Sequence, residues 1–291
     1  MTTWQILITV HVLMSTIMSL YARRLSLRSR GVFFAIGVLS YLMVALFGLI
    51  YGTIATGGTI SWPSATAWIF IIVEGVFIPM AWLLEYKIIS NIGAGNSAVA
   101  GTLYKLAAAM MGIILLQEAL SIEFAIGAVL ILSSALLSLK IKPDVDHVSS
   151  LAAPAKIGLL LIGSILFGIG MYAEKSAVSL IGPWDYMWYG WSMQFVGALV
   201  IFLFYGRGEI QHLTPSIIRQ GLFLGVLTVT AGGLYIWALS LGSLSQTVIA
   251  AGAKTALIIV FAALFLREHN AIPLRITAFI ISTIGLWLVL Q

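Results

Sequence analysis

Two apolar stretches, AGNSAVAGTLYKLAAAMMGIILL at 94–116 and LSQTVIAAGAKTALIIVFAALFL at 244–266, each carry one lysine near the middle, Lys105 and Lys254. Each stretch is long enough for a helix to cross a hydrocarbon core of about 30 Å at 1.5 Å per residue. A charge at that depth costs roughly 2.5 to 3.5 kcal/mol on insertion scales. Since both halves of the chain carry this cost, we expect the two lysines to hold a negatively charged substrate.

The composition indicates a membrane environment for the rest of the chain as well. Of 291 residues, 61% are hydrophobic and only 9% are charged, and the mean hydropathy is +1.08. A soluble domain carries about 25% charged residues. The chain is therefore predicted to be an all-α, polytopic membrane protein whose main partner is the lipid bilayer. Cysteine is absent, which excludes disulfides, thiolate metal sites and a cysteine nucleophile.

Apolar runs of roughly 17 to 25 residues predict ten transmembrane helices. They are expected at 4–21, 31–51, 67–84, 94–116, 122–139, 157–177, 184–205, 218–239, 244–266 and 271–290.

The basic residues predict the orientation. Twelve of the 15 fall in the connections of one face, and the other three are Lys105, Lys175 and Lys254. Cytoplasmic connections are enriched in Lys and Arg, so both termini are predicted outside, in the cell (inner) membrane if the source is prokaryotic. The net charge of +5 is then a topology signal, and no nucleic-acid partner is expected. The chain is expected to be a monomer or a homodimer.

A weak internal repeat divides the chain. A shift of 150 residues places Leu116-Gln117-Glu118 on Leu266-Arg267-Glu268 and brings Lys105 to within one residue of Lys254. Five helices in each half is an odd number, so the two halves would be inverted relative to each other, as in secondary transporters. The expected units are a first five-helix repeat at 1–140, a linker at 141–156 and a second repeat at 157–291. The alternative is that the similarity reflects only the low complexity of membrane helices.

The lysines lie too deep to reach water on their own. Lys105 is about 11 residues from either end of its span, or roughly 16 Å, which exceeds the reach of a snorkelling lysine. Small residues accompany both lysines, and Thr102 and Thr255 offer hydroxyls beside them. These groups suit binding of an oxygen-rich anion. The alternative is that a buried carboxylate neutralises a lysine, with Glu74 as the obvious candidate.

Other polar residues in the spans carry two interpretations each. His11 is either a proton carrier or a hydrogen-bonding group between helices. Glu74 is either a proton-coupling carboxylate or an ion-pair partner. The neighbours Glu174 and Lys175 form either an interfacial pair or part of a gate.

Aromatic residues also have two possible roles. The outer members of the run 184–191 suit the membrane interface. Tyr104, Tyr172 and Trp191 lie deeper, where they would either stack on a ring of the substrate or pack between helices.

Three segments carry a resemblance to a known family: GIGMYAEK at 168–175 followed by WYGWSMQ at 188–194, NSAVAGTLYKL at 96–106, and AAGAKT at 250–255. The chain resembles the ten-helix drug/metabolite transporter superfamily (EamA-type), and within it the nucleotide-sugar transporters, nearest the CMP-sialic acid/UDP-galactose branch. The segments are similar to that branch's sixth helix ending in Glu-Lys with its Trp-x-Arg-Asn-x-Gln stretch, its fourth-helix Gln-Leu-Lys segment, and its ninth-helix lysine segment.

The resemblance implies an antiporter in which Lys105 and Lys254 contact the phosphate-bearing part of the substrate and Tyr104 lines the pocket. It also implies polar contacts at the Arg-Asn-x-Gln positions, where this chain keeps Gln194 but has Trp191 and Ser192 in place of Arg-Asn. The fourth-helix glutamine has no counterpart here. The relatives keep their termini in the cytosol, opposite to the orientation predicted from the basic residues.

The expected function is therefore secondary active transport, in antiport mode, of a small anionic, phosphorylated or nucleotide-linked metabolite. Transport would occur by alternating access around a midplane site formed by Lys105 and Lys254. The alternative is a proton-coupled exporter of amino acids or other amphipathic metabolites that uses Glu74 and His11. An enzyme is not expected, and neither catalytic residues, a metal site nor a cofactor is predicted, because the four histidines form no HExxH motif.

Overall fold

The structure is a computed structural model that describes residues 2–28, 32–92, 94–138, 153–265 and 272–291. All regular secondary structure within these ranges is helical. The elements are α1 (Thr3–Arg28), α2 (Phe33–Ala55), α3 (Ala65–Ile92), α4 (Ala94–Leu115), α5 (Ile122–Ser138), α6 (Ala153–Tyr205), the 3₁₀ helix η1 (Arg207–His212), α7 (Pro215–Leu241), α8 (Leu244–Gly252), α9 (Lys254–Phe265) and α10 (Ile272–Val289).

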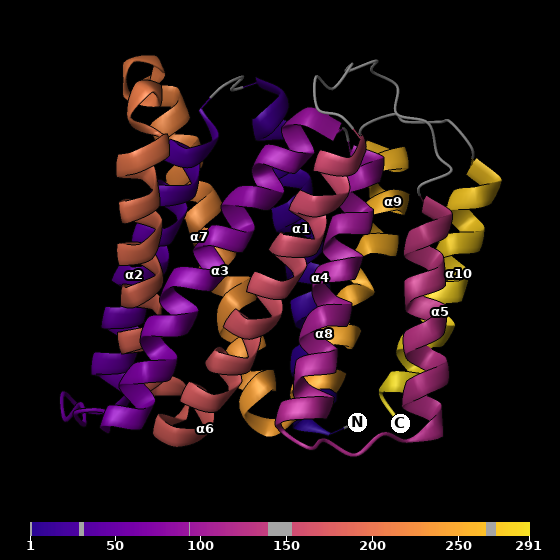
Figure 1. Cartoon of the computed structure of the whole chain (residues 1–291), viewed down its shortest axis with the longest axis horizontal. Coiled ribbons are helices and arrows are strands. Elements are labelled where there is room, and N and C mark those ends of the chain that lie inside the picture. The colour runs from indigo at the N-terminus through magenta and orange to yellow at the C-terminus, as the bar shows by residue number, and fades with distance from the viewer. Residues whose placement is uncertain (1, 29–31, 93, 139–152, 266–271) are drawn as a thin grey trace.

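The helices form a bundle with its long elements side by side (Figure 1). Among the described residues, five segments are long and apolar enough to cross a membrane, and they lie in α1, α2, α3, α6 and α7. Large apolar side chains cover much of the exterior, including Ile54 at 73% and Phe204 at 78% exposed. Soluble proteins rarely expose apolar surface on this scale. The predicted class, an all-α membrane protein, therefore agrees with the structure.

The chain reverses direction inside α6. Gly182 has φ 78° and ψ 166°, a backbone conformation that glycine adopts without a steric cost. Pro183 follows, where its fixed φ suits the first position of a helix. We refer to 153–181 as the first arm of α6 and to 183–205 as the second arm. The predicted separation between helices at 157–177 and 184–205 corresponds to this turn.

The span predicted at 244–266 as one uninterrupted helix is wrong in that detail. The structure divides it into α8 and α9 at Ala253. The amides of Ala253 and Ala256 donate to the carbonyls of Ala250 and Ala253, at 3.1 and 3.2 Å. Bonds to the third preceding residue wind the chain more tightly than an α-helix. Lys254 is consequently the first residue of α9 rather than the middle of a regular helix.

Glycines allow the close approach of several helix pairs. A side-chain carbon built on Gly127 of α5 would lie 2.6 Å from the carbonyl oxygen of Gly285 in α10, and one built on Gly285 would lie 2.8 Å from that of Gly127. Small residues permit such contacts between membrane helices. The other extensive pairings are α1 with α7, and α6 with α2, α3 and α4.

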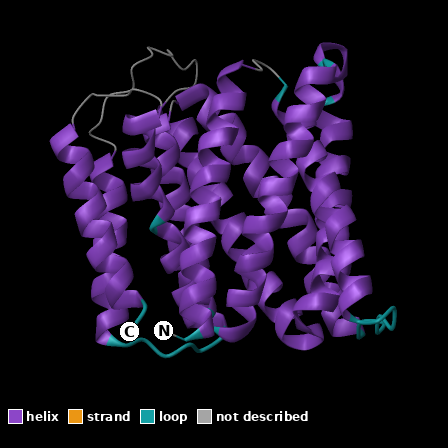
Figure 2. Ribbon diagram, turned by 180° about the vertical axis from the view of Figure 1, so that it is seen from behind, coloured by secondary structure: helices purple, strands orange, loops and turns teal. Residues whose placement is uncertain are grey.

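The start of α1 and the end of α10 lie at the same end of the bundle (Figures 1 and 2). The side-chain amide of Gln5 donates to the carbonyl of Leu290 there. We call this the N/C end. Residues 141–152 of the linker predicted at 141–156 lie outside the described residues, and α6 begins within the remainder at Ala153.

Candidate functional site

Lys105 and Lys254 both lie at the turn between α8 and α9. Lys105 extends from α4, and its Cδ lies 3.4 Å from the position that a side-chain carbon on Gly252 would occupy. Lys254 begins α9 and places its Nζ 5.8 Å from the centroid of the Trp82 ring in α3. An ammonium group at this distance is attracted to an aromatic face. Both lysines are half-buried, and we call this region the lysine site.

His11 joins the same region from α1. Its Nδ1 lies 2.8 Å from the carbonyl oxygen of Ala231 in α7, so Nδ1 carries the hydrogen of that bond. The ring lies 5.2 Å from the ring of Tyr235. Both Lys105 and Lys254 act electrostatically on the imidazole. The lysine site is thus enclosed by α1, α3, α4 and the α8–α9 turn, which belong to both halves of the sequence.

Four polar side chains form a second, separate cluster, which we call the carboxylate network. Gln194 donates from Nε2 to Glu74 Oε2 at 2.8 Å and to the Tyr186 hydroxyl at 3.2 Å. Tyr186 donates to Glu174 Oε1 at 2.8 Å. The exposed fractions are 0% for Glu74 and Tyr186, 5% for Glu174 and 6% for Gln194. The network therefore connects two carboxyl groups through neutral donors in a fully buried position.

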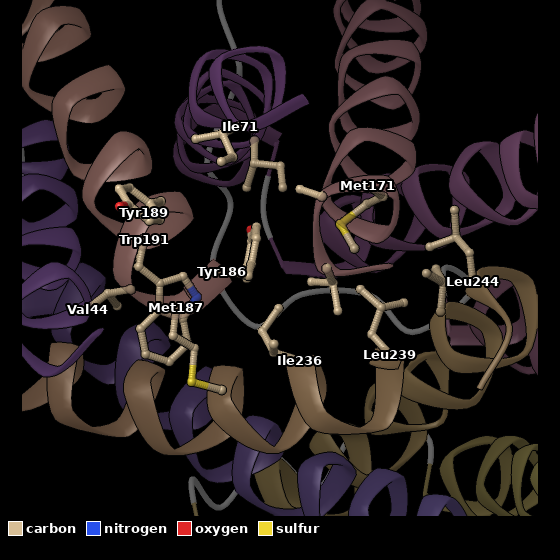
Figure 3. Packing of buried hydrophobic residues seen from close by; sticks show 14 of the residues in the cluster. Val44, Ile71, Met171, Tyr186, Met187, Tyr189, Trp191, Ile236, Leu239 and Leu244 are labelled. Carbon is tan, nitrogen blue, oxygen red and sulfur yellow. The ribbon is translucent and has the colours of Figure 1, made fainter. Parts of the chain in front are cut away.

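Tight packing surrounds this network. Figure 3 shows the Tyr186 ring between Ile71 of α3 and Ile236 of α7. Gly190 leaves room for the carboxyl, since a side-chain carbon there would lie 2.9 Å from Glu74 Oε1 and 2.7 Å from Tyr186 Cζ. Glu74 Oε1 itself is buried with no hydrogen-bond partner. The space around this oxygen is therefore set by protein atoms alone.

Opposite charges hold the turn between α7 and α8 at the N/C end. Lys175 donates from Nζ to the carbonyls of Leu239 and Gly242, at 2.7 and 2.8 Å. Glu118 accepts from the amides of Leu244 and Ser245, at 2.5 and 2.8 Å. A cation at a helix C-terminus and an anion at a helix N-terminus both complement the helix dipole. We call this arrangement the α7–α8 clamp.

An open cleft of about 550 Å³ lies beside the clamp. It does not include Lys105 or Lys254. Its lining residues come from α3, the α4–α5 connection, the first arm of α6 and the α7–α8 turn: Thr66, Phe70, Leu116, Glu118, Lys175, Ser176, Ser179, Leu180 and Ser243.

The structure brings some of the predicted polar residues together and separates others. Gln194 and Glu174 join Glu74 in the carboxylate network. Glu74 thus contacts Gln194 rather than a lysine. Glu174 and Lys175, although adjacent in sequence, contact different partners rather than each other. Ser192 donates to the carbonyl of Trp188 within its own helix.

The predicted aromatic residues pack between helices. Tyr104 is 2% exposed, its ring stacks on Phe167 at 5.6 Å, and its hydroxyl lies against Gly163 of α6. Tyr172 meets Phe70 edge-on at 5.8 Å. Trp191 is 3% exposed in the main apolar cluster (Figure 3).

The two predicted threonines complete the set. Thr255 is half-buried in the first turn of α9. Thr102 lies in α4, and its side chain is outside the described part of the structure.

Sequence reasoning missed three contributors to these sites. Tyr186 was assigned with the interfacial aromatics, yet it connects Gln194 to Glu174. Glu118 was noted only as a turn residue, and Trp82 was not considered. The sequence did align Glu118 with Glu268 in the internal repeat. That alignment singled out Glu118 but did not indicate which groups it contacts.

No family model and no curated protein matches the chain. The fold is similar to that of a solved structure described only as "Crystal structure of protein", with a TM-score of 0.78 and 12% sequence identity over 98% of this chain and 96% of that chain. At this identity the likeness concerns the fold alone.

Proposed function

We propose that the protein is a secondary active transporter, operating as an antiporter, for a small anionic metabolite that is phosphorylated or nucleotide-linked. The observation that carries the proposal is the approach of Lys105, from the first half of the chain, to the α8–α9 turn in the second half, directly after which Lys254 begins α9. Two half-buried lysines at this turn suit an oxyanion, because charge-assisted hydrogen bonds replace its hydration.

The proposal includes two inverted repeats of five membrane helices each. This count treats the two arms of α6 as separate helices and α8 with α9 as one. The helix pairings support it: α1 packs on α7, and the first arm of α6 packs on α3, where a side-chain carbon on Gly170 would lie 2.7 Å from Ile78 Cγ1. In the proposed repeats α1 corresponds to the first arm of α6, and α7 corresponds to α3, so each of these two pairings is the counterpart of the other. The contact between Gly127 and Gly285 is likewise its own counterpart, because each glycine packs on the carbonyl of the other.

Membership of the drug/metabolite transporter superfamily is part of the same proposal, supported by the segments at 168–175 and 250–255. So is a location in the cell (inner) membrane with both termini outside, supported by the distribution of basic residues.

The proposed mechanism is alternating access around the lysine site. An anion neutralises Lys105 and Lys254, so the loaded carrier can close around it. An empty site leaves two ammonium groups near each other in a medium of low dielectric constant, and their repulsion disfavours the closed state. The loaded carrier therefore reorients faster than the empty carrier, which favours exchange over net transport.

A second candidate is proton-coupled export of amino acids or other amphipathic metabolites through Glu74 and His11. The observation that favours it is that Glu74 is fully buried and receives its hydrogen bond from neutral Gln194. A buried carboxyl with this environment is a suitable proton carrier. His11, which bonds to a backbone carbonyl, gives the candidate less support.

Ligand screening tests the choice between the two candidates. The purified protein is heated with nucleotides, nucleotide sugars, sugar phosphates, amino acids and organic cations in turn. Stabilisation by phosphorylated compounds alone supports the anion carrier. Stabilisation by cations or amino acids alone refutes it.

Transport mode is tested in liposomes. Uptake of the stabilising compound is measured with and without the same compound inside. Faster uptake into preloaded liposomes supports exchange, and equal rates contradict it.

A further inference from the structure

The carboxylate network contains two acids that the lysine site does not use. Glu74 and Glu174 receive hydrogen bonds from Gln194 and Tyr186, both neutral groups. With both carboxyls ionised, two negative charges would share one buried cluster and repel each other. Two close carboxyls in such a site cannot both ionise readily. The arrangement therefore requires a proton on one of them.

The two carboxyls differ in their hydrogen-bond partners. Glu174 Oε1 lies 2.8 Å from the Tyr186 hydroxyl, whose oxygen accepts from Gln194 at 3.2 Å. Glu74 accepts only through Oε2, and its Oε1 is buried with no partner. A protonated Oε1 tolerates that position better than a charged one, because a buried charge needs hydrogen bonds.

Glu174 is the charged neighbour of Glu74 within the network. From α4, Tyr104 faces Gly163 of α6 and Lys105 faces Gly252. Tyr186 of α6 bonds to Gln194 and Glu174, and Tyr235 of α7 packs against the same apolar cluster as Tyr186.

The open cleft at the N/C end lies close to the network along two of its helices. The cleft of about 550 Å³ is lined by Phe70, one helical turn before Glu74 in α3, and by Lys175, the residue after Glu174. The same α3 helix continues to Trp82 beside Lys254. Eight residues, or about 12 Å, separate Glu74 from Trp82.

A proline lies between these two positions of α3. Pro79 is inside the helix and removes the amide that would bond the carbonyl of Gly75. That carbonyl packs against Gly197 of the second arm of α6. Prolines are the usual sites of helix bending, so α3 can bend between the carboxylate network and the lysine site.

We propose that the carboxylate network is a binding site for one exchangeable proton, carried by Glu74 and released to water in the cleft, and that this proton is the coupling ion of the transport cycle. Release converts the Glu74 carboxyl to a carboxylate and transfers the proton to a water molecule. The two resulting carboxylates repel each other across Tyr186 and Gln194. Only the coupling role rests on the transport function proposed above, since proton binding does not require a substrate.

Infrared spectroscopy of the substrate-free protein tests proton binding. Wild-type protein at neutral pH is expected to show the carbonyl band of one buried, protonated carboxylic acid. The band disappears in Glu74→Gln, remains in Glu174→Gln, and remains in the control Glu123→Gln, whose side chain is exposed at the start of α5. Absence of the band in the wild type overturns the proposal without any variant. Loss in Glu174→Gln with retention in Glu74→Gln overturns the assignment of the proton.

Liposome transport tests coupling. A pH gradient is expected to drive accumulation of substrate by the wild type and by Glu123→Gln, whereas Glu74→Gln loses the response to the gradient when its uptake is compared with its own rate of exchange. A full response in Glu74→Gln overturns the coupling role. Absence of exchange in the wild type instead refutes the antiport proposal and leaves the infrared result standing.

Discussion

The lysine site and the carboxylate network lie in the same bundle and share α3, but their charged groups have opposite signs and different surroundings. The acids receive hydrogen bonds from neutral groups held between α3 and the two arms of α6. The lysines lie at a tight turn between α8 and α9, beside an aromatic face and a histidine. The comparison teaches that Glu74 and Glu174 are held by hydrogen bonds from the neutral side chains of Gln194 and Tyr186.

The largest effect is expected from removal of both ammonium groups. In the double variant Lys105→Gln/Lys254→Gln, affinity for a phosphorylated ligand should fall by at least 100-fold, since a hydrogen bond to a charged group contributes about 1.5 to 3 kcal/mol. Calorimetric titration of the purified protein measures this change. Arg219→Gln, at an exposed position of α7, should bind as the wild type does. Equal losses of affinity in both variants would show that the loss comes from the lower net charge of the protein and not from the lysine site.

A substitution in the carboxylate network is expected to lower the stability of the protein rather than its affinity for the ligand. Tyr186→Phe removes the hydroxyl that bonds to Glu174 and to Gln194. Leaving buried polar groups without a partner costs about 1 to 3 kcal/mol. A lower unfolding temperature with ligand affinity within a few-fold of wild type is expected. Tyr51→Phe, at an exposed position of α2, is the matched control and should unfold as the wild type does.

The clamp of Glu118 and Lys175 gives a smaller effect at the N/C end. Glu118→Ala deprives the amides of Leu244 and Ser245 of their acceptor. Loss of a capping side chain costs about 0.5 to 2 kcal/mol. Hydrogen exchange of the α8 amides should accelerate in this variant while that of α3 is unchanged. Equal acceleration in both helices would contradict a local role.

The smallest effect is expected at the α8–α9 turn itself. In Gly252→Ala the new methyl group would lie 3.1 Å from Ile131 Cγ2 and 3.4 Å from Lys105 Cδ, which small movements of two side chains accommodate. The free energy of unfolding should fall by less than about 1 kcal/mol, while ligand affinity falls a few-fold because Lys105 is displaced. Gly158→Ala, where nothing lies within 4 Å, should change neither quantity by as much.

Much of the fold follows from hydropathy. The apolar runs predicted an all-α membrane protein with separate helices at 157–177 and 184–205, and the structure places the turn between them at Gly182. The division of 244–266 into α8 and α9 was not predicted, because the sequence around Ala253 is composed of ordinary membrane-helix residues without proline. The tight turn there depends on the helices packed around it.

The lysines were found from sequence because a charge at the centre of a membrane helix is costly wherever it lies. The carboxylate network was not found from sequence, because its hydrogen bond from Gln194 to Glu74 joins residues 120 positions apart. Each of these residues was noted singly, and only the arrangement of α3 against both arms of α6 makes them neighbours. The pairing of Glu118 with the α8 amides has the same long-range origin.

The bond between Gln5 and Leu290 brings the two ends of the chain together at one end of the bundle (Figure 2). Reporter domains fused to either terminus therefore start from the same end of the bundle. A short, flexible peptide is long enough to join the ends directly. The bundle is consequently suited to circular permutation, with new ends opened in an exposed connection such as the one between α2 and α3.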